Sequence, residues 1–220
     1  MNRIRICSAI LCSALFLIAS GSKSADPLIS DEMLNHLRSN HTEEAYRRGL
    51  AANELLNELE GKSVEHQLTE VNRFFNQFAY QEDDVVWGAE DYWATPTEFI
   101  GARTGDCEDF VIAKYFALRK LGVPDDRLYL TYVKALKQNV AHMVLSYFET
   151  PGSIPLVLDN YNPMILTADK RNDLLPVYSF NAESLFLTNA SAGLGQSLPT
   201  NKIKNSKWKK LLSDIQKEKQ

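Results

Sequence analysis

The sequence predicts an α+β fold in which helices come first and an antiparallel sheet follows. Apolar residues recur at helical spacing through the first part of the chain, up to the break at Gly122-Val123-Pro124. After that break, short segments of strand-like periodicity are separated by turn residues. Helices followed by a run of strands are typical of α+β proteins.

The composition is that of an ordinary globular protein. The chain has 220 residues, of which 45% are apolar and 24% charged, enough for a domain with its own hydrophobic core. The formal net charge is −4. This charge argues against a nucleic-acid binder, which normally carries a basic face.

Residues 1–25 have the pattern of a secretory signal peptide. Arg3 and Arg5 precede an apolar run from Ile6 to Ala19, and small residues follow. The apolar run is shorter than the roughly 20 residues that span a bilayer. We therefore expect an exported chain that begins near Asp26 and is not inserted in the membrane.

Helices are expected at the start of the domain, which we place at residues 26–187. Thr42 and Ser63 stand in the cap positions of two of them, and Gly61 closes the first. Thr95-Pro96-Thr97-Glu98 has the pattern of a capping box with proline in the first turn. A further helix is expected to begin at Cys107 and to end at Gly122.

Strands are expected over residues 128–133, 141–148 and 154–158, and a different kind of segment over 188–220. Residues 188–199 are polar and small, as in a linker, and a basic amphipathic tail follows. Its apolar residues on one helical face are Trp208, Leu211, Leu212 and Ile215. We expect this tail to pack on the domain or to fray, and contact with a partner or a membrane surface is the alternative.

Cys107 is the one cysteine outside the predicted leader, because Cys7 and Cys12 lie within it. Exported proteins usually use cysteines in pairs, so a single thiol is either a small buried hydrophobe or a reactive group. The predicted position at a helix start favours the reactive group, since the unpaired amides there stabilise a thiolate.

His142 and Asp159 are the candidate partners of this thiol. His142 lies inside a predicted strand, whereas His36, His41 and His66 lie in polar stretches where surface placement is expected. If the two strands pair about a two-residue turn, the side chains of His142 and Asp159 lie on one face of the sheet. A five-residue loop would shift the alternation by one residue, and the two side chains would then lie on opposite faces.

The order cysteine, histidine, aspartate is the layout of papain-like and transglutaminase-like enzymes. Cys107 would attack an acyl carbon, His142 would take and return the proton, and Asp159 would hold the imidazole.

Acidic residues crowd the candidate nucleophile. Those that flank it or can reach it from the preceding loop are Asp106, Glu108, Asp109, Asp83 and Asp84. Helix capping needs one or two of them, but three carboxylates around a thiol raise its pKa. A divalent cation removes this conflict, and clustered carboxylates favour Ca²⁺. Zinc is less suited, since His142 is already committed and no second cysteine remains.

Two runs carry a family resemblance: Asp91-Tyr92-Trp93-Ala94-Thr95-Pro96-Thr97-Glu98-Phe99 and Gly105-Asp106-Cys107-Glu108-Asp109-Phe110. With His142 before Met143 and Asp159 before Asn160-Tyr161, they resemble the bacterial transglutaminase-like cysteine proteinases over residues 64–187. The resemblance implies Cys107, His142 and Asp159 as the catalytic residues. It implies Asp106 and Glu108 as calcium ligands, ahead of Asp109, Asp83 and Asp84.

The resemblance also implies a biological role. Members similar to this chain are periplasmic, calcium-dependent endoproteases that clip the N-terminal region of a large surface adhesin, typically at a di-alanine bond, so that a biofilm disperses. An inner-membrane receptor that senses cyclic di-GMP sequesters such a protease, and we expect residues 81–87 to contribute to that contact. Two alternatives stay open: an acyltransferase or transglutaminase using the same three groups, and a non-catalytic binding module.

Overall fold

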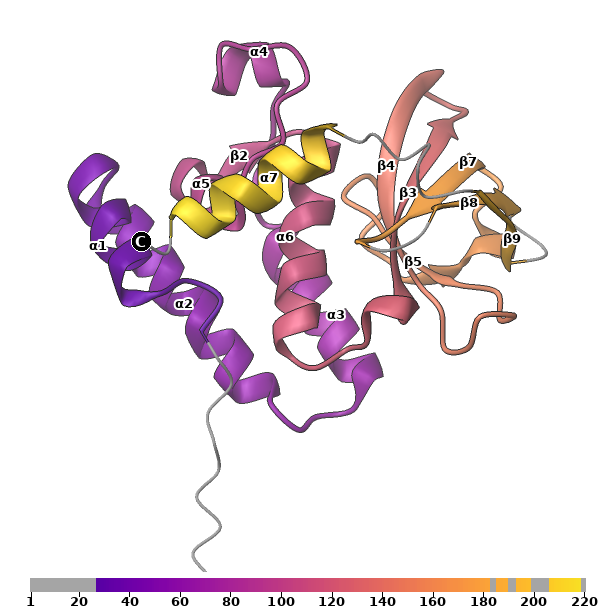
Figure 1. The fold of residues 1–220 in the computed structure, drawn as a ribbon, viewed down its shortest axis with the longest axis horizontal. Coiled ribbons are helices and arrows are strands. Elements are labelled where there is room, and N and C mark those ends of the chain that lie inside the picture. The colour runs from indigo at the N-terminus through magenta and orange to yellow at the C-terminus, as the bar shows by residue number, and fades with distance from the viewer. Residues whose placement is uncertain (1–26, 183–184, 190–192, 199–205, 219–220) are drawn as a thin grey trace, which may run out of the picture.

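The computed structural model describes residues 27–182, 185–189, 193–198 and 206–218 (Figure 1), so the predicted leader lies outside the described residues. The helices are α1 (Asp31–Asn40), α2 (Glu43–Leu59), α3 (Val64–Phe75), α4 (Asp83–Val86), α5 (Pro96–Ala102), α6 (Cys107–Lys120) and α7 (Ser206–Lys217). Short 3₁₀ turns cover Asp125–Arg127 and Ala168–Lys170. Among the described residues, no helix combines the length and apolar character that a membrane span needs.

The strands form one large sheet and one short pair. β1 (Ala79–Tyr80) and β2 (Thr104–Gly105) are parallel. The large sheet is antiparallel, in the order β6-β5-β4-β3-β7-β8-β9. Its strands are β3 (Leu128–Ala135), β4 (Val140–Tyr147), β5 (Leu156–Leu158), β6 (Leu166–Thr167), β7 (Leu174–Phe180), β8 (Leu185–Asn189) and β9 (Gly193–Leu198). Helices before an antiparallel sheet confirm the α+β prediction.

The predicted helix starts are formed by the predicted caps. The Thr42 and Ser63 hydroxyls accept hydrogen bonds from the amides three residues ahead, at the starts of α2 and α3. Thr95 and Glu98 make the reciprocal bonds of a capping box at the start of α5. Helix α1, which Ser30 caps, was not predicted from the sequence.

Helix α6 stands between the other helices and the sheet (Figure 1). It packs against β3 and β4 on one side and against α3 and α5 on the other. Its buried residues lie all around its axis, from Phe110 and Ile112 to Tyr115 and Leu118, as expected for a helix inside the core. This position brings the start of α6 against the middle of the sheet.

The expected linker at residues 188–199 is wrong for its described part, because the sheet continues through it. β8 pairs with β7 and with β9, so the sheet runs past the domain boundary that we placed at residue 187. The small residues have a packing reason: a Cβ built on Gly195 would lie 2.5 Å from the carbonyl oxygen of Leu187. Glycine permits this close backbone approach, and small residues of this kind gave the segment the composition of a linker.

The basic tail forms α7, which packs on the domain as expected. Trp208 is 5% exposed, and its ring stacks on Phe116 with centroids 5.9 Å apart. Leu211 is also buried. Lys207 pairs with Asp91, and the ammonium of Lys210 lies 4.8 Å from the ring centroid of Tyr92. The tail is therefore part of the folded domain.

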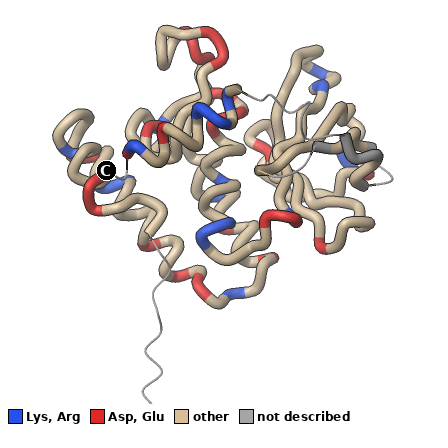
Figure 2. The backbone as a smooth tube through the Cα atoms, viewed as in Figure 1, with Lys and Arg blue, Asp and Glu red and all other residues tan. Residues whose placement is uncertain are grey.

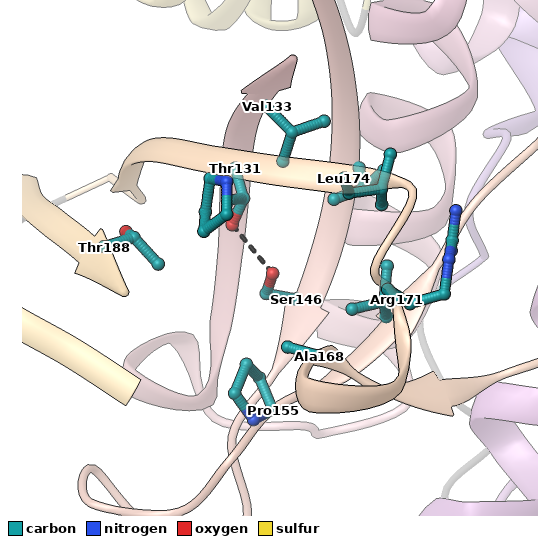
Figure 3. A pocket seen from close by; sticks show the side chains of 11 residues that line it. Thr131, Val133, Ser146, Pro155, Ala168, Arg171, Leu174 and Thr188 are labelled. Atoms are coloured by element: carbon teal, nitrogen blue, oxygen red, sulfur yellow. Dashed lines mark hydrogen bonds between the residues drawn. The ribbon is translucent and has the colours of Figure 1, made fainter. Parts of the chain in front are cut away.

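A small hollow lies in the sheet (Figure 3). It is lined by Thr131, Val133, Val144, Ser146, Pro155, Val157, Ala168, Arg171, Leu174, Pro176 and Thr188. The Thr131 hydroxyl bonds to those of Ser146 and Ser179, each at 2.7 Å. The Arg171 side chain borders the hollow, but its guanidinium points away from Thr131 and Ser146 (Figure 3).

Candidate active site

Cys107 is the first residue of α6, and Asp106 is its N-cap. Cys107 is 7% exposed. It donates a hydrogen bond to Glu108 Oε2 at 2.7 Å and accepts one from the backbone amide of Met143 on β4. The cysteine therefore lies where the start of a buried helix meets the strand that carries His142.

The surroundings of the thiol keep it protonated in this arrangement. Burial raises the pKa of Cys107 well above its ordinary value, and the negative charges of Glu108 and Asp106 raise it further. The hydrogen bond from the Met143 amide acts in the opposite direction. Formation of a thiolate therefore requires a base and a partial neutralisation of these acids.

His142 is buried on β4 and its imidazole is held on two sides. Nε2 lies 2.8 Å from Asp159 Oδ1, and the ring stacks on Tyr161 with centroids 4.0 Å apart and an interplanar angle of 6°. Nδ1 is buried and has no hydrogen-bond partner among the described residues. Nδ1 is thus the nitrogen free to exchange a proton with a thiol.

The pairing of β4 with β5 explains why histidine and aspartate meet. Leu145 is opposite Leu158, so the midpoint of the paired strands falls between Pro151 and Gly152. This is the same midpoint parity as for a two-residue turn, although the connecting loop is longer. Extending this register places His142 opposite Tyr161, with Asp159 two residues away on the same face. The same-face prediction holds, with the pair diagonal instead of directly opposite.

Asp159 is ionised and fixed by four hydrogen bonds. Burial alone would raise its pKa, but hydrogen bonds to His142, Arg171 and the Tyr161 amide outweigh burial and hold it below the ordinary value. Arg171 Nη2 donates to Asp159 Oδ2 at 2.6 Å, and the Tyr161 amide donates to Oδ1 at 2.9 Å. The Asp159 backbone carbonyl accepts from Asn76 Nδ2 at 2.8 Å.

Sequence reasoning missed Arg171, Tyr161 and Asn76 as supports of this pair. Arg171 is 2% exposed and also donates two hydrogen bonds to Asp173. The parity of the hairpin could have identified Tyr161, because it falls on the same face as His142. Nothing in the local sequence singles out Asn76, which lies 83 residues before Asp159.

An acidic pocket adjoins the thiol. Its lining consists wholly of acids: Glu82, Asp83, Asp84, Glu90, Asp91, Asp106 and Glu108. Figure 2 shows how acidic residues gather around α4, close to the basic start of α7. Four of these residues are candidate ligands predicted from the sequence, and the loop acids Glu82, Glu90 and Asp91 join them.

Two groups of potential ligand atoms share this region. One consists of Asp83, Asp106 and Asp109, and the other of Asp106, Cys107 and Glu108; within each group the atoms lie within 4.8 Å of one another. Asp84 lines the pocket but belongs to neither group. Asp106 is common to both, so it is the best placed of the predicted ligands.

The donor set fits a calcium ion. Burial, followed by the Glu108 and Asp109 charges, raises the pKa of Asp106 far above the ordinary range, and burial raises that of Asp83 to about 6. Asp83 Oδ1 is buried with no hydrogen-bond partner among the described residues. Carboxylates that cannot all ionise together, and an unpartnered buried oxygen, suit a hard cation with oxygen ligands.

Asp109 also forms hydrogen bonds with residues outside this site. Its Oδ1 accepts from the Ala94 amide at 2.8 Å, and its Oδ2 accepts from Trp87 Nε1 at 3.4 Å. A Cβ on Gly105 would collide with this carboxylate. The tryptophan-containing run and the acidic frame of the cysteine are thus joined through Asp109.

His36, His41 and His66 are exposed, as expected.

This α+β fold has a cysteine at the start of a buried helix that packs against the histidine-bearing strand of an antiparallel sheet, which is the arrangement of the transglutaminase-like class of cysteine proteinases. The chain belongs to the bacterial transglutaminase-like cysteine proteinase family BTLCP, whose model matches residues 42–173.

Solved structures agree with this assignment. The chain is 44% identical to Legionella pneumophila LapG, with a TM-score of 0.71, and the match covers 86% of this chain and 99% of that one. An EGTA-treated LapG gives 44% identity and a TM-score of 0.73 over 86% of this chain and 100% of that one. A calcium-bound LapG gives 44% and 0.71 over 85% and 99%. A comparison with curated proteins gave no match.

Proposed function

We propose that this chain is a calcium-dependent endoprotease in which Cys107, His142 and Asp159 act as a catalytic triad. The observation that carries the proposal is the buried His142–Asp159 pair, with Nδ1 of His142 unpaired, on the strand whose next amide contacts the Cys107 thiol.

The reaction follows from these groups. His142 takes the thiol proton, and the Cys107 thiolate forms a bond to the acyl carbon of the substrate peptide. The resulting imidazolium, stabilised by Asp159, returns the proton to the leaving amine as the peptide C–N bond breaks. Water then gives a proton to His142 and hydrolyses the thioester, which restores the thiol and releases the new carboxyl group. Backbone amides at the start of α6 can stabilise the oxyanion.

We assign calcium to the acidic pocket. Asp106 and Glu108 would hold the ion, together with Asp83 or Asp109. When bound, the ion would neutralise the charges that raise the pKa of Cys107. Support comes from the donor set described above and from the calcium-bound and EGTA-treated forms of the similar LapG.

We infer that the substrate is the N-terminal region of a large surface adhesin, cleaved in the periplasm so that the adhesin is released and the biofilm disperses. An inner-membrane cyclic di-GMP receptor would hold the protease when the nucleotide is abundant. Both inferences rest on the resemblance in the two sequence motifs and on the 44% identity to LapG. Val85 in the α4 segment is 64% exposed and could contribute to the contact with this receptor.

The test is incubation of the purified protein with an adhesin N-terminal fragment that contains a di-alanine bond, with and without an added primary amine. A protease gives two fragments in both reactions: the N-terminal fragment ends in a new carboxylate, and the C-terminal fragment begins with a new amino group. Incorporation of the amine into the product would assign the chain to the acyltransferases instead. A folded Cys107→Ser variant that matches the wild type in every assay would leave only a binding module.

A further inference from the structure

Lys114 is a charged residue in the centre of the core. It lies seven residues after Cys107 on α6, about two helical turns, and is 0% exposed. Its ammonium donates a hydrogen bond to Asn76 Oδ1 at 2.7 Å and lies 5.8 Å from the ring centroid of Phe110. No carboxylate forms an ion pair with Lys114 within the part of the chain that the structure describes.

Packing alone does not explain a lysine here. A buried ammonium loses its hydration, and one neutral hydrogen-bond partner restores only part of that loss. A methionine of similar length would fill the same space without this cost. Burial lowers the pKa of Lys114 to about 7, and attraction to Asp159 is the opposing influence.

Asn76 connects this charge to the active site. It is the C-cap residue of α3, and its side chain has a partner at each end. Oδ1 accepts from Lys114, and Nδ2 donates to the backbone carbonyl of Asp159 at 2.8 Å. The lysine therefore fixes which way the amide points, since the ammonium can only donate.

The hold on the Asp159 main chain is separate from the hold on its carboxylate. Arg171 and the Tyr161 amide bind the carboxylate oxygens, whereas Asn76, at the end of helix α3, binds the backbone carbonyl. Among the hydrogen bonds of the described residues, the Asn76 bond is the one that joins Asp159 to the helical part of the fold, which also contains α6 and Cys107.

We propose that Lys114 and Asn76 are positioning residues: the buried ammonium orients the Asn76 amide, and that amide holds the Asp159 main chain where its carboxylate meets His142. The inference rests on the proposed triad, because its effect reaches the substrate only through Asp159 and His142.

The experiment compares three variants with the wild type in cleavage of the adhesin fragment and in thermal unfolding. Lys114→Met keeps the volume and removes the charge. Asn76→Asp keeps an acceptor for Lys114 and loses the donor to Asp159. Ile112→Ala is the matched control, since Ile112 is fully buried on the same helix and has no part in these hydrogen bonds.

We expect kcat to fall about 10- to 100-fold in Lys114→Met and in Asn76→Asp, with KM nearly unchanged, because a misplaced catalytic group slows the chemical step. The melting temperature of Lys114→Met should equal or exceed that of the wild type. Ile112→Ala should melt at a lower temperature and keep its kcat.

Wild-type kcat in both Lys114→Met and Asn76→Asp would overturn the proposal. So would a loss of kcat in Lys114→Met accompanied by a drop in melting temperature as large as that of Ile112→Ala. If the wild type itself does not cleave, the proposed function fails, and the alkylation rate of Cys107 by iodoacetamide then tests positioning alone. Slower alkylation in both variants supports the proposal, and equal rates refute it.

Discussion

The imidazole of His142 lies flat against the phenol ring of Tyr161, with the centroids 4.0 Å apart. Both residues belong to the β4–β5 hairpin and its extension, so the register of this strand pair sets the position of His142 and of the Tyr161 ring that covers it. The stack leaves the imidazole edges free for Asp159 at Nε2 and for a proton at Nδ1.

The stacked ring gives a first prediction. Tyr161→Phe keeps the stack and should cleave the adhesin fragment at close to the wild-type rate, whereas Tyr161→Ala should lower kcat up to about tenfold. Aromatic pairs of this kind contribute about 0.5–1.5 kcal/mol beyond their buried area. Steady-state kinetics of the two variants checks this, and equal losses in both would mean that the hydroxyl group matters instead.

Arg171 supplies a second prediction. Arg171→Met should leave the buried Asp159 carboxylate without its cationic partner, so that its pKa rises and the protein is destabilised by about 3–5 kcal/mol. Since the lost interaction lowers the folded-state pKa, the deficit should be largest at neutral pH and shrink as the pH falls through the titration of Asp159. Urea denaturation at pH 7 and pH 4 measures it. A deficit independent of pH would contradict this reading.

Removal of calcium gives a third prediction. EGTA should abolish cleavage and lower the melting temperature, and calcium should restore both better than magnesium, because a ligand at 100 times its Kd stabilises a fold by about 2.7 kcal/mol. Asp106→Asn should weaken calcium binding in calorimetry far more than Asp84→Asn, since Asp84 belongs to neither ligand group. Full cleavage in excess EGTA, with the metal content measured as zero, would rule out the proposed calcium site.

Lys114 gives a fourth prediction, on the pH dependence of stability. Its folded pKa of about 7 lies below the value near 10.4 of an unfolded lysine. Between these values the unfolded chain binds a proton that the folded chain does not, so the free energy of unfolding gains a contribution that rises with pH.

Asp159 is the charged group that acts on Lys114 in this range, while its neighbours Asn76 and Phe110 do not titrate. Denaturation of the wild type and of Lys114→Met at pH 7, 8 and 9 tests the prediction. The wild type should gain stability relative to the variant at each step. Parallel pH profiles would show that Lys114 has an ordinary pKa.

The C-terminal helix gives a fifth prediction. Trp208→Ala should destabilise the protein by about 3–5 kcal/mol, the usual cost of removing a buried aromatic side chain. Lys209 is exposed on the same helix, and Lys209→Ala should stay near the wild-type value. Chemical denaturation of both variants decides whether α7 is an integral part of the domain.

Features set by neighbouring residues could be predicted from the sequence, and features set by distant contacts could not. The caps at Thr42, Ser63 and Thr95 depend on residues three positions away, and turn parity placed His142 and Asp159 on one face. β9 was read as a linker because its stability comes from pairing with β8. Asn76 and Arg171 reach Asp159 from other segments, and no local pattern marks such a contact.

The division of the site between two structural units also has a consequence for biosynthesis. Cys107 belongs to α6 in the helical part, while His142 and Asp159 belong to the sheet, so a chain with only one part folded holds no assembled triad. Nascent and partly folded molecules would then be inactive toward their neighbours. Proteolytic competence would arise only at the moment when helices and sheet dock.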